Sequence, residues 1–76
     1  MSLKPRIGDV LWFKIAPGEI RPLLVVQAWS PTCVSGELTL LANDVYKGPG
    51  LITGPNKAAL ASVELGEDVF QWLPRD

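Results

Sequence analysis

Glycine and proline divide this 76-residue chain into short segments, and this division limits the folds that are open to it. Seven glycines and seven prolines fall between the apolar runs, and no helical period of useful length remains. The runs are rich in β-branched and aromatic residues, which is the composition of strands. The sequence therefore predicts an all-β fold.

Five segments are predicted to be strands: residues 9–15, 21–29, 34–41, 61–65 and 69–73. Gly36 is expected to mark a bulge near the start of the third strand, and residues 66–68 are expected to turn the last two strands into a hairpin. The best helix candidate, residues 56–62, makes about two turns at most. Five short strands without helices favour a small SH3-like barrel, because closing the sheet removes its edges.

The length indicates a single small domain over residues 8–76, preceded by a flexible arm over residues 1–7. A chain of this size hides only about 60% of the surface that its unfolded form exposes. Its lone cysteine, Cys33, excludes an internal disulfide. Several strands are apolar on both faces, as in Leu23-Leu24-Val25-Val26, and one small core cannot cover both. We therefore expect the outer face to pack on another copy or to hold a ligand.

Histidine is absent, and this absence excludes several classes of chemistry. It rules out histidine acid–base catalysis, Ser-His and Cys-His nucleophiles and the usual zinc ligand sets. We therefore expect no enzyme, no catalytic residue, no cofactor and no metal. A net charge of −1 argues against nucleic acid and membrane surfaces as partners. No apolar run is long enough to span a membrane and no signal peptide is visible, so we expect a cytoplasmic protein.

Residues 42–60 contain no predicted strand, and a loop of this length is usually functional or mobile. Its glycine amides and lysines can wrap an anionic ligand, or the segment can be a plain flexible connection. Its glycines do not match a nucleotide-binding motif. Tryptophan can stack on a planar ligand, anchor an interface or fill a core. The predicted ligand-binding residues combine these groups: Trp12, Arg21, Trp29, Tyr46, Lys47, Asn56, Lys57 and Trp72.

Three stretches resemble a group of short phage and prophage proteins of uncertain function. They are residues 8–13, residues 21–29, and an ending in which Ser62-Val63 is followed by Phe70-Gln71-Trp72-Leu73-Pro74. The leucine between Trp72 and Pro74 departs from the ending of that group. The resemblance covers most of the chain through short motifs. It implies a phage or mobile-element origin, hence the host cytoplasm, and a binding role without catalytic residues.

Two stretches are similar to the MazF/PemK-like toxins, a family of SH3-like ribonucleases: Gly8-Asp9-Val10 and Arg21-Pro22-Leu23-Leu24-Val25-Val26. The resemblance covers residues 1–42 and implies that Arg21 assists RNA cleavage. The chain departs from the family where Leu41-Ala42-Asn43-Asp44 replaces a hydroxyl-bearing segment, and it lacks the C-terminal helix. Without the resemblance, Arg21 is expected to form a surface ion pair with Glu19.

These observations predict a non-enzymatic binding protein that forms homo-oligomers. In one version it is an adaptor for a phage or host protein and uses the apolar outer faces of its strands. In the other it sequesters a small anionic nucleotide between subunits, with tryptophans on the base and Arg21, Lys47 and Lys57 on the phosphates. A MazF/PemK-like ribonuclease is the alternative.

Overall fold

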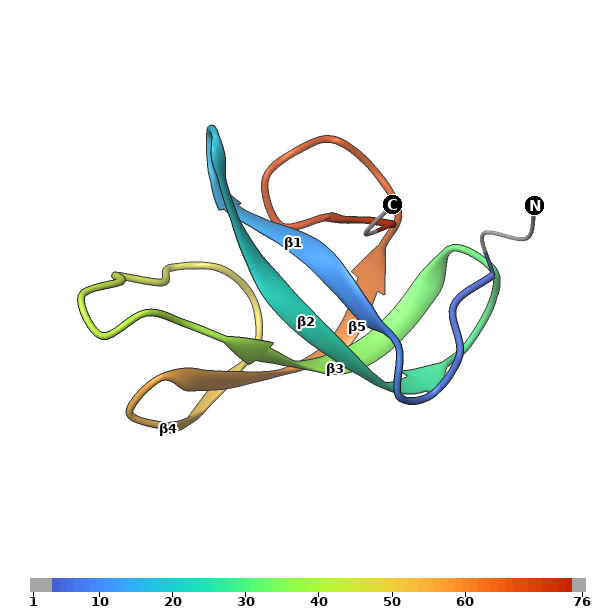
Figure 1. The fold of residues 1–76 in the computed structure, drawn as a ribbon, viewed down its shortest axis with the longest axis horizontal. Coiled ribbons are helices and arrows are strands. Elements are labelled where there is room, and N and C mark those ends of the chain that lie inside the picture. Colours follow the sequence, from blue (N-terminus) through green and yellow to red (C-terminus); the bar gives the residue numbers. More distant parts are fainter. Residues whose placement is uncertain (1–3, 75–76) are drawn as a thin grey trace.

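The computed structural model describes residues 4–74, which form one antiparallel sheet of six strands. The strand order across the sheet is β4-β5-β3-β2-β1-β6 (Figure 1). The all-β prediction is confirmed, with six strands in place of five. In chain order the strands are β1 (Val10–Ala16), β2 (Glu19–Ala28), β3 (Cys33–Thr39), β4 (Leu51–Gly54), β5 (Lys57–Glu64) and β6 (Trp72–Leu73).

The core lies on the concave side of this sheet and follows the two-residue period of the strands. Leu11 and Phe13 of β1 are buried, as are Leu23 and Val25 of β2. Trp72 of β6 lies opposite Phe13 and has no exposed surface, so the shortest strand supplies the largest core side chain. The other buried apolar residues are Val34, Leu38, Leu40, Ala58, Leu60 and Val63.

The sheet curls but is not closed into a barrel. Its first and last strands, β4 and β6, are not paired with each other. The chain after β5 touches β6 through an isolated bridge between Leu65 and Trp72 and a 3.0 Å hydrogen bond from the Gly66 amide to the Trp72 carbonyl. The predicted hairpin of residues 61–65 and 69–73 is wrong, because β6 forms its ladder with β1.

The prediction of a strandless loop over residues 42–60 is also wrong, since this segment contains β4 and the first half of β5. Residues 57–62 of the helix candidate (56–62) belong to β5, and Asn56 lies in the turn before it. Lysine, alanine and leucine favour helices in isolation, but Ala58 and Leu60 alternate into the core beside β3. Burial of that face on the sheet outweighs the local preference.

Gly36 marks an irregularity in the sheet, as expected. The register of β3 against β5 shifts between Val34 and Gly36. A Cβ atom on Gly36 would lie 2.5 Å from the Leu24 carbonyl oxygen, so only glycine lets β2 approach this closely.

The predicted N-terminal arm is only partly described. Residues 1–3 and 75–76 lie outside the described residues. Of the rest of the arm, Pro5 is buried, and the Arg6 amide donates to the Asp9 carboxylate at 2.8 Å. Pro5 is therefore packed against the domain, whereas Arg6 and Ile7 are exposed.

Candidate functional site

Arg21 is held in an ion pair at the start of β2. Its Nε donates to Asp44 Oδ2 at 2.7 Å, and its Nη2 donates to Asp44 Oδ1 at 2.8 Å. The predicted ion pair with Glu19 also forms, at 3.2 Å. The Nη1 group donates to the Ile20 carbonyl at 2.8 Å. Each terminal nitrogen and the Nε atom of the guanidinium therefore already has a partner within the chain.

The Arg21–Asp44 pair fixes the segment between β3 and β4 to β2. The Arg21 hydrogen bond, and then the 2.7 Å hydrogen bond from the Leu41 amide, lower the pKa of Asp44 from 3.8 to about 2. The same hydrogen bond to Asp44 raises the pKa of Arg21 above its ordinary value. Because this pair is bidentate, it anchors Asp44 to β2.

Tyr46 belongs to an aromatic cluster and does not stand free in the loop. Its ring meets Phe13 at 6.2 Å and Phe70 at 5.9 Å between centroids, edge to face in both cases. Its hydroxyl donates to the Pro49 carbonyl. Burial raises the pKa of Tyr46 to about 12. The ring predicted to bind a ligand instead packs this loop onto the core.

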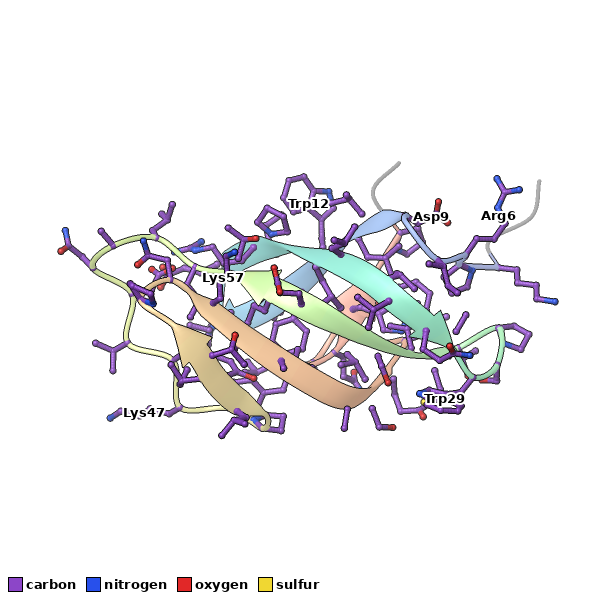
Figure 2. All side chains as sticks on the ribbon, turned by 90° about the horizontal axis from the view of Figure 1, so that it is seen from below. Arg6, Asp9, Trp12, Trp29, Lys47 and Lys57 are labelled. Atoms are coloured by element: carbon purple, nitrogen blue, oxygen red, sulfur yellow. The ribbon has the colours of Figure 1, made fainter. Side chains whose placement is uncertain are left out.

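The three tryptophans predicted to stack on a ligand lie in different places. Trp72 is completely buried, and its Nε1 donates to the Thr32 carbonyl at 3.0 Å. It is a core residue, so its assignment to a surface ligand site is corrected. Trp12 projects from the convex side of the sheet, and Trp29 lies at the far end, beyond β2 (Figure 2). No planar ligand can touch all three.

The polar loop residues of the prediction do not converge on a site either. Figure 2 shows Lys47 well apart from Trp12 and Trp29, whereas Lys57 lies on the same side of the sheet as Trp12, with β2 and β3 between them. Lys57 is paired with Glu37 at 3.9 Å on the convex side of the sheet. Asn56 is exposed in the turn between β4 and β5, and its carbonyl accepts from the Leu40 amide at 2.8 Å. The predicted nucleotide-binding set is therefore dispersed over the domain.

The convex side of the sheet carries a continuous apolar surface, which we call the outer face. Along β2, Ile20, Leu24 and Val26 are 42%, 41% and 50% exposed. In the ladder, Leu24 lies opposite Val10 of β1. The next pair along the strands, Trp12 and Pro22, is half-buried on the same face. The outer face comprises Val10, Trp12, Ile20, Pro22, Leu24 and Val26.

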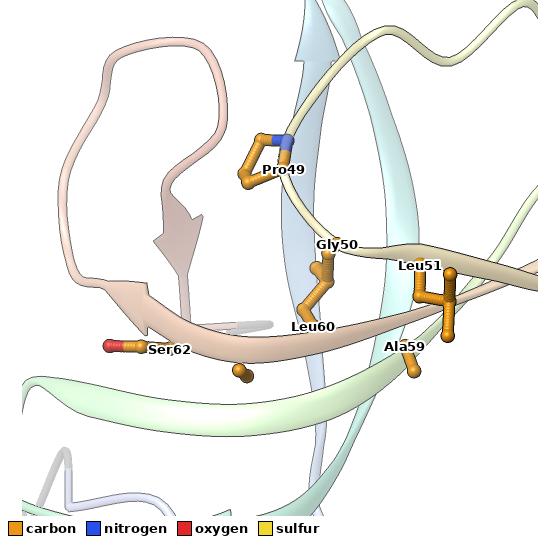
Figure 3. A pocket seen from close by; sticks show the side chains of 7 residues that line it. Pro49, Gly50, Leu51, Ala59, Leu60 and Ser62 are labelled. Atoms are coloured by element: carbon orange, nitrogen blue, oxygen red, sulfur yellow. The ribbon is translucent and has the colours of Figure 1, made fainter.

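A second surface feature lies at the β4 end of the sheet, and we call it the edge groove. It has a volume of about 400 Å³ (Figure 3). No charged side chain lines it, and its walls are formed by Pro49, Gly50, Leu51, Ala59, Leu60, Ala61 and Ser62. Local sequence patterns do not reveal this groove, because β4 and the first half of β5 fall within the segment 42–60 that was expected to be a strandless loop.

Two polar contacts connect the edge groove with residues behind it. The Ser35 hydroxyl donates to the Ala61 carbonyl and itself accepts from Trp29 Nε1 at 2.6 Å. Cys33 Sγ lies 3.2 Å from the Ser62 hydroxyl oxygen. The thiol of Cys33 therefore touches a groove residue directly, and the exposed indole of Trp29 is connected to one through Ser35.

Neither a metal site nor a membrane helix is found in the described part of the chain. No group of three or more Cys, Asp or Glu side chains within residues 4–74 has the geometry to hold a metal ion. No helix in this range has the length and apolar character needed to cross a membrane.

No protein-family model, no curated protein and no solved structure matches this chain. The resemblances to phage proteins and to MazF/PemK-like toxins therefore stay predictions.

Proposed function

We propose that this protein is a non-enzymatic adaptor, of phage or mobile-element origin, that binds other polypeptides and works as a homo-oligomer. The observation that carries the proposal is the outer face, where three large aliphatic side chains of one strand are about half exposed. Contiguous apolar surface of this kind marks interaction sites in soluble proteins.

The charge distribution around the outer face fits contact between two copies. The charged side chains near it do not oppose this contact, because Glu37 and Lys57 already pair with each other. A neutral apolar centre with a polar rim is the usual anatomy of such an interface.

The adaptor version fits the geometry better than nucleotide sequestration. A nucleotide site needs cations beside an aromatic surface, and the edge groove contains neither. Trp12 and Lys57 share the convex side, but Lys57 is paired with Glu37, and Lys47 and Trp29 lie apart from both. The ribonuclease alternative requires a free Arg21, and Asp44 holds this side chain with two hydrogen bonds.

Sedimentation equilibrium over a concentration series tests the proposal. We expect the wild type to form a dimer or larger oligomer, and Leu24→Glu to shift the equilibrium toward monomer because it places a charge at the centre of the outer face. The control is Val45→Glu, which adds the same charge to a residue that is 78% exposed outside that face. A wild type that stays monomeric, or equal behaviour of the two variants, would refute self-association through this face.

A further inference from the structure

The second half of β5 has a neighbouring strand on one side only. The β3 ladder follows β5 as far as Glu64, which lies opposite Cys33. The β4 ladder stops at Ala59, which lies opposite Leu51. Gly50, with a φ of 108°, turns the chain away from β5 at this point. Within residues 4–74, the edge of β5 over residues 60–64 therefore lies open.

This open edge carries neither charge nor proline over residues 60–63. Between Leu60 and Val63 the ladder passes one residue more of β5 than of β3, which marks a bulge at residues 61–62. Lysine, proline and short length are the usual ways in which proteins block an exposed edge. Residues 60–63 read Leu-Ala-Ser-Val, without charge or proline, and Glu64 follows only at the end. The edge groove lies directly beside this segment and is lined by Leu60, Ala61 and Ser62 (Figure 3).

We propose that the edge groove binds an extended segment of a partner polypeptide, which adds to β5 as an antiparallel strand in line with β4. Beyond Ala59 the backbone groups of β5 that face away from β3 have no strand partner, and another extended backbone is the ligand that matches such groups. The segment that already occupies this edge, β4, is itself an antiparallel strand. Apolar side chains of the bound segment fill the groove, whose lining carries no charge.

A free peptide segment fits this edge better than a second copy of the chain. If the β5 strands of two copies paired edge to edge, each copy would bring its own Pro49–Gly50 turn to the contact. Gly50 lies so close to β5 that a Cβ atom on it would come within 2.4 Å of Leu60 and 2.6 Å of the Ala59 carbonyl. The turn of one copy would therefore meet the strand of the other, whereas an extended segment brings no such turn.

This inference rests on the proposed adaptor role but not on the outer face. The two surfaces use different residues, so Leu24→Glu is expected to remove self-association and to leave peptide binding unchanged. If the wild type self-associates but binds no peptide, the proposal for the edge groove is refuted and the proposal for the outer face is unaffected.

The test uses a displayed library of random short peptides selected on the full-length protein. We expect enriched peptides with alternating apolar residues and without proline. A synthetic peptide from this set, titrated into ¹⁵N-labelled protein, is expected to shift the backbone amides of residues 60–64 and slow their hydrogen exchange. The peptide is also expected to shift the Trp29 indole resonance. The indole donates to the Ser35 hydroxyl, which in turn donates to the carbonyl of the groove residue Ala61.

Matched variants assign the binding to the groove. Ala61→Lys places a charge in the groove and is expected to weaken peptide binding about tenfold or more. Ala42→Lys makes the same change at an exposed residue outside the groove and is expected to bind like the wild type. Ser62→Lys, also at an exposed position, replaces Ala61→Lys if that variant does not fold.

Three results would overturn the proposal. The first is a library that yields no enriched peptide. The second is a peptide that binds Ala61→Lys or Ser62→Lys as tightly as it binds Ala42→Lys. The third is a shift of the same edge amides when protein concentration alone is raised, which would show that a second copy occupies the edge.

Discussion

Phe70 has a backbone conformation that side chains rarely adopt, and this gives a sharp stability prediction. Its φ is 68°, in the left-handed region. Its amide donates to the Lys14 carbonyl at 2.8 Å, and its ring packs 6.3 Å from that of Phe13. The core contact and the turn into β6 therefore hold the residue in a strained conformation.

Two substitutions separate the backbone strain from the loss of the ring. Phe70→Ala and Phe70→Gly remove the same aromatic packing, so this loss cancels in their difference. A left-handed residue with a Cβ atom costs roughly 1–2 kcal/mol, whereas glycine in place of alanine costs roughly 0.5–1 kcal/mol through the entropy of the unfolded chain. We therefore expect Phe70→Gly to be more stable than Phe70→Ala by about 0.5–1 kcal/mol.

Urea unfolding followed by tryptophan fluorescence measures this difference. With a slope of about 1 kcal/mol per molar for a domain of this size, the midpoint of Phe70→Gly should lie about 0.5–1 M above that of Phe70→Ala. The control is Ala59→Gly in the regular ladder of β5, where glycine should lower the midpoint by a similar amount. A Phe70→Gly variant less stable than Phe70→Ala would refute the argument.

Two further predictions concern stability. Asp44 has a pKa of about 2 in the folded protein and 3.8 ordinarily, so its contribution is present above about pH 4 and is lost as the pH falls toward 2. Thermal unfolding at a series of pH values should show this loss, and Asp44→Asn should lack it; equal pH profiles would contradict the pairing. Gly36→Ala brings a Cβ against the Leu24 carbonyl and should cost about 1–3 kcal/mol, which lowers the melting temperature by roughly 5–15 °C. Gly54→Ala meets open space and should not lower it, so a smaller loss at Gly36 than at Gly54 would contradict the close approach.

The sequence was most informative where burial and local preference agree. In β1 and β2, β-branched and aromatic residues alternate between core and surface, and the expected strands 9–15 and 21–29 match the observed ones within two residues. In β5 the two signals conflict, because Lys57-Ala58-Ala59-Leu60 favours a helix locally while the core selects a strand. The pairing of β6 with β1 joins distant segments, which local patterns do not reveal.

The candidate site was harder to predict than the fold. The ion pair of Arg21 with Glu19 was visible because the two residues are neighbours in the sequence. The stronger partner, Asp44, is 23 residues away, and no local pattern indicates it. The edge groove exists because β4 is shorter than β5, and the length of a strand depends on where its neighbour turns away. That neighbour turns away at Gly50, which has a φ of 108°.

The position of Trp72 has a consequence for how the chain folds as it is made. This residue fills the core from β6, the last strand in chain order among the described residues, and its ladder partner β1 is the first. Pairings between segments so far apart in sequence form late and slowly. The core of this domain is therefore complete only once β6 has been made and has paired with β1, and until then β1 has one unpaired edge.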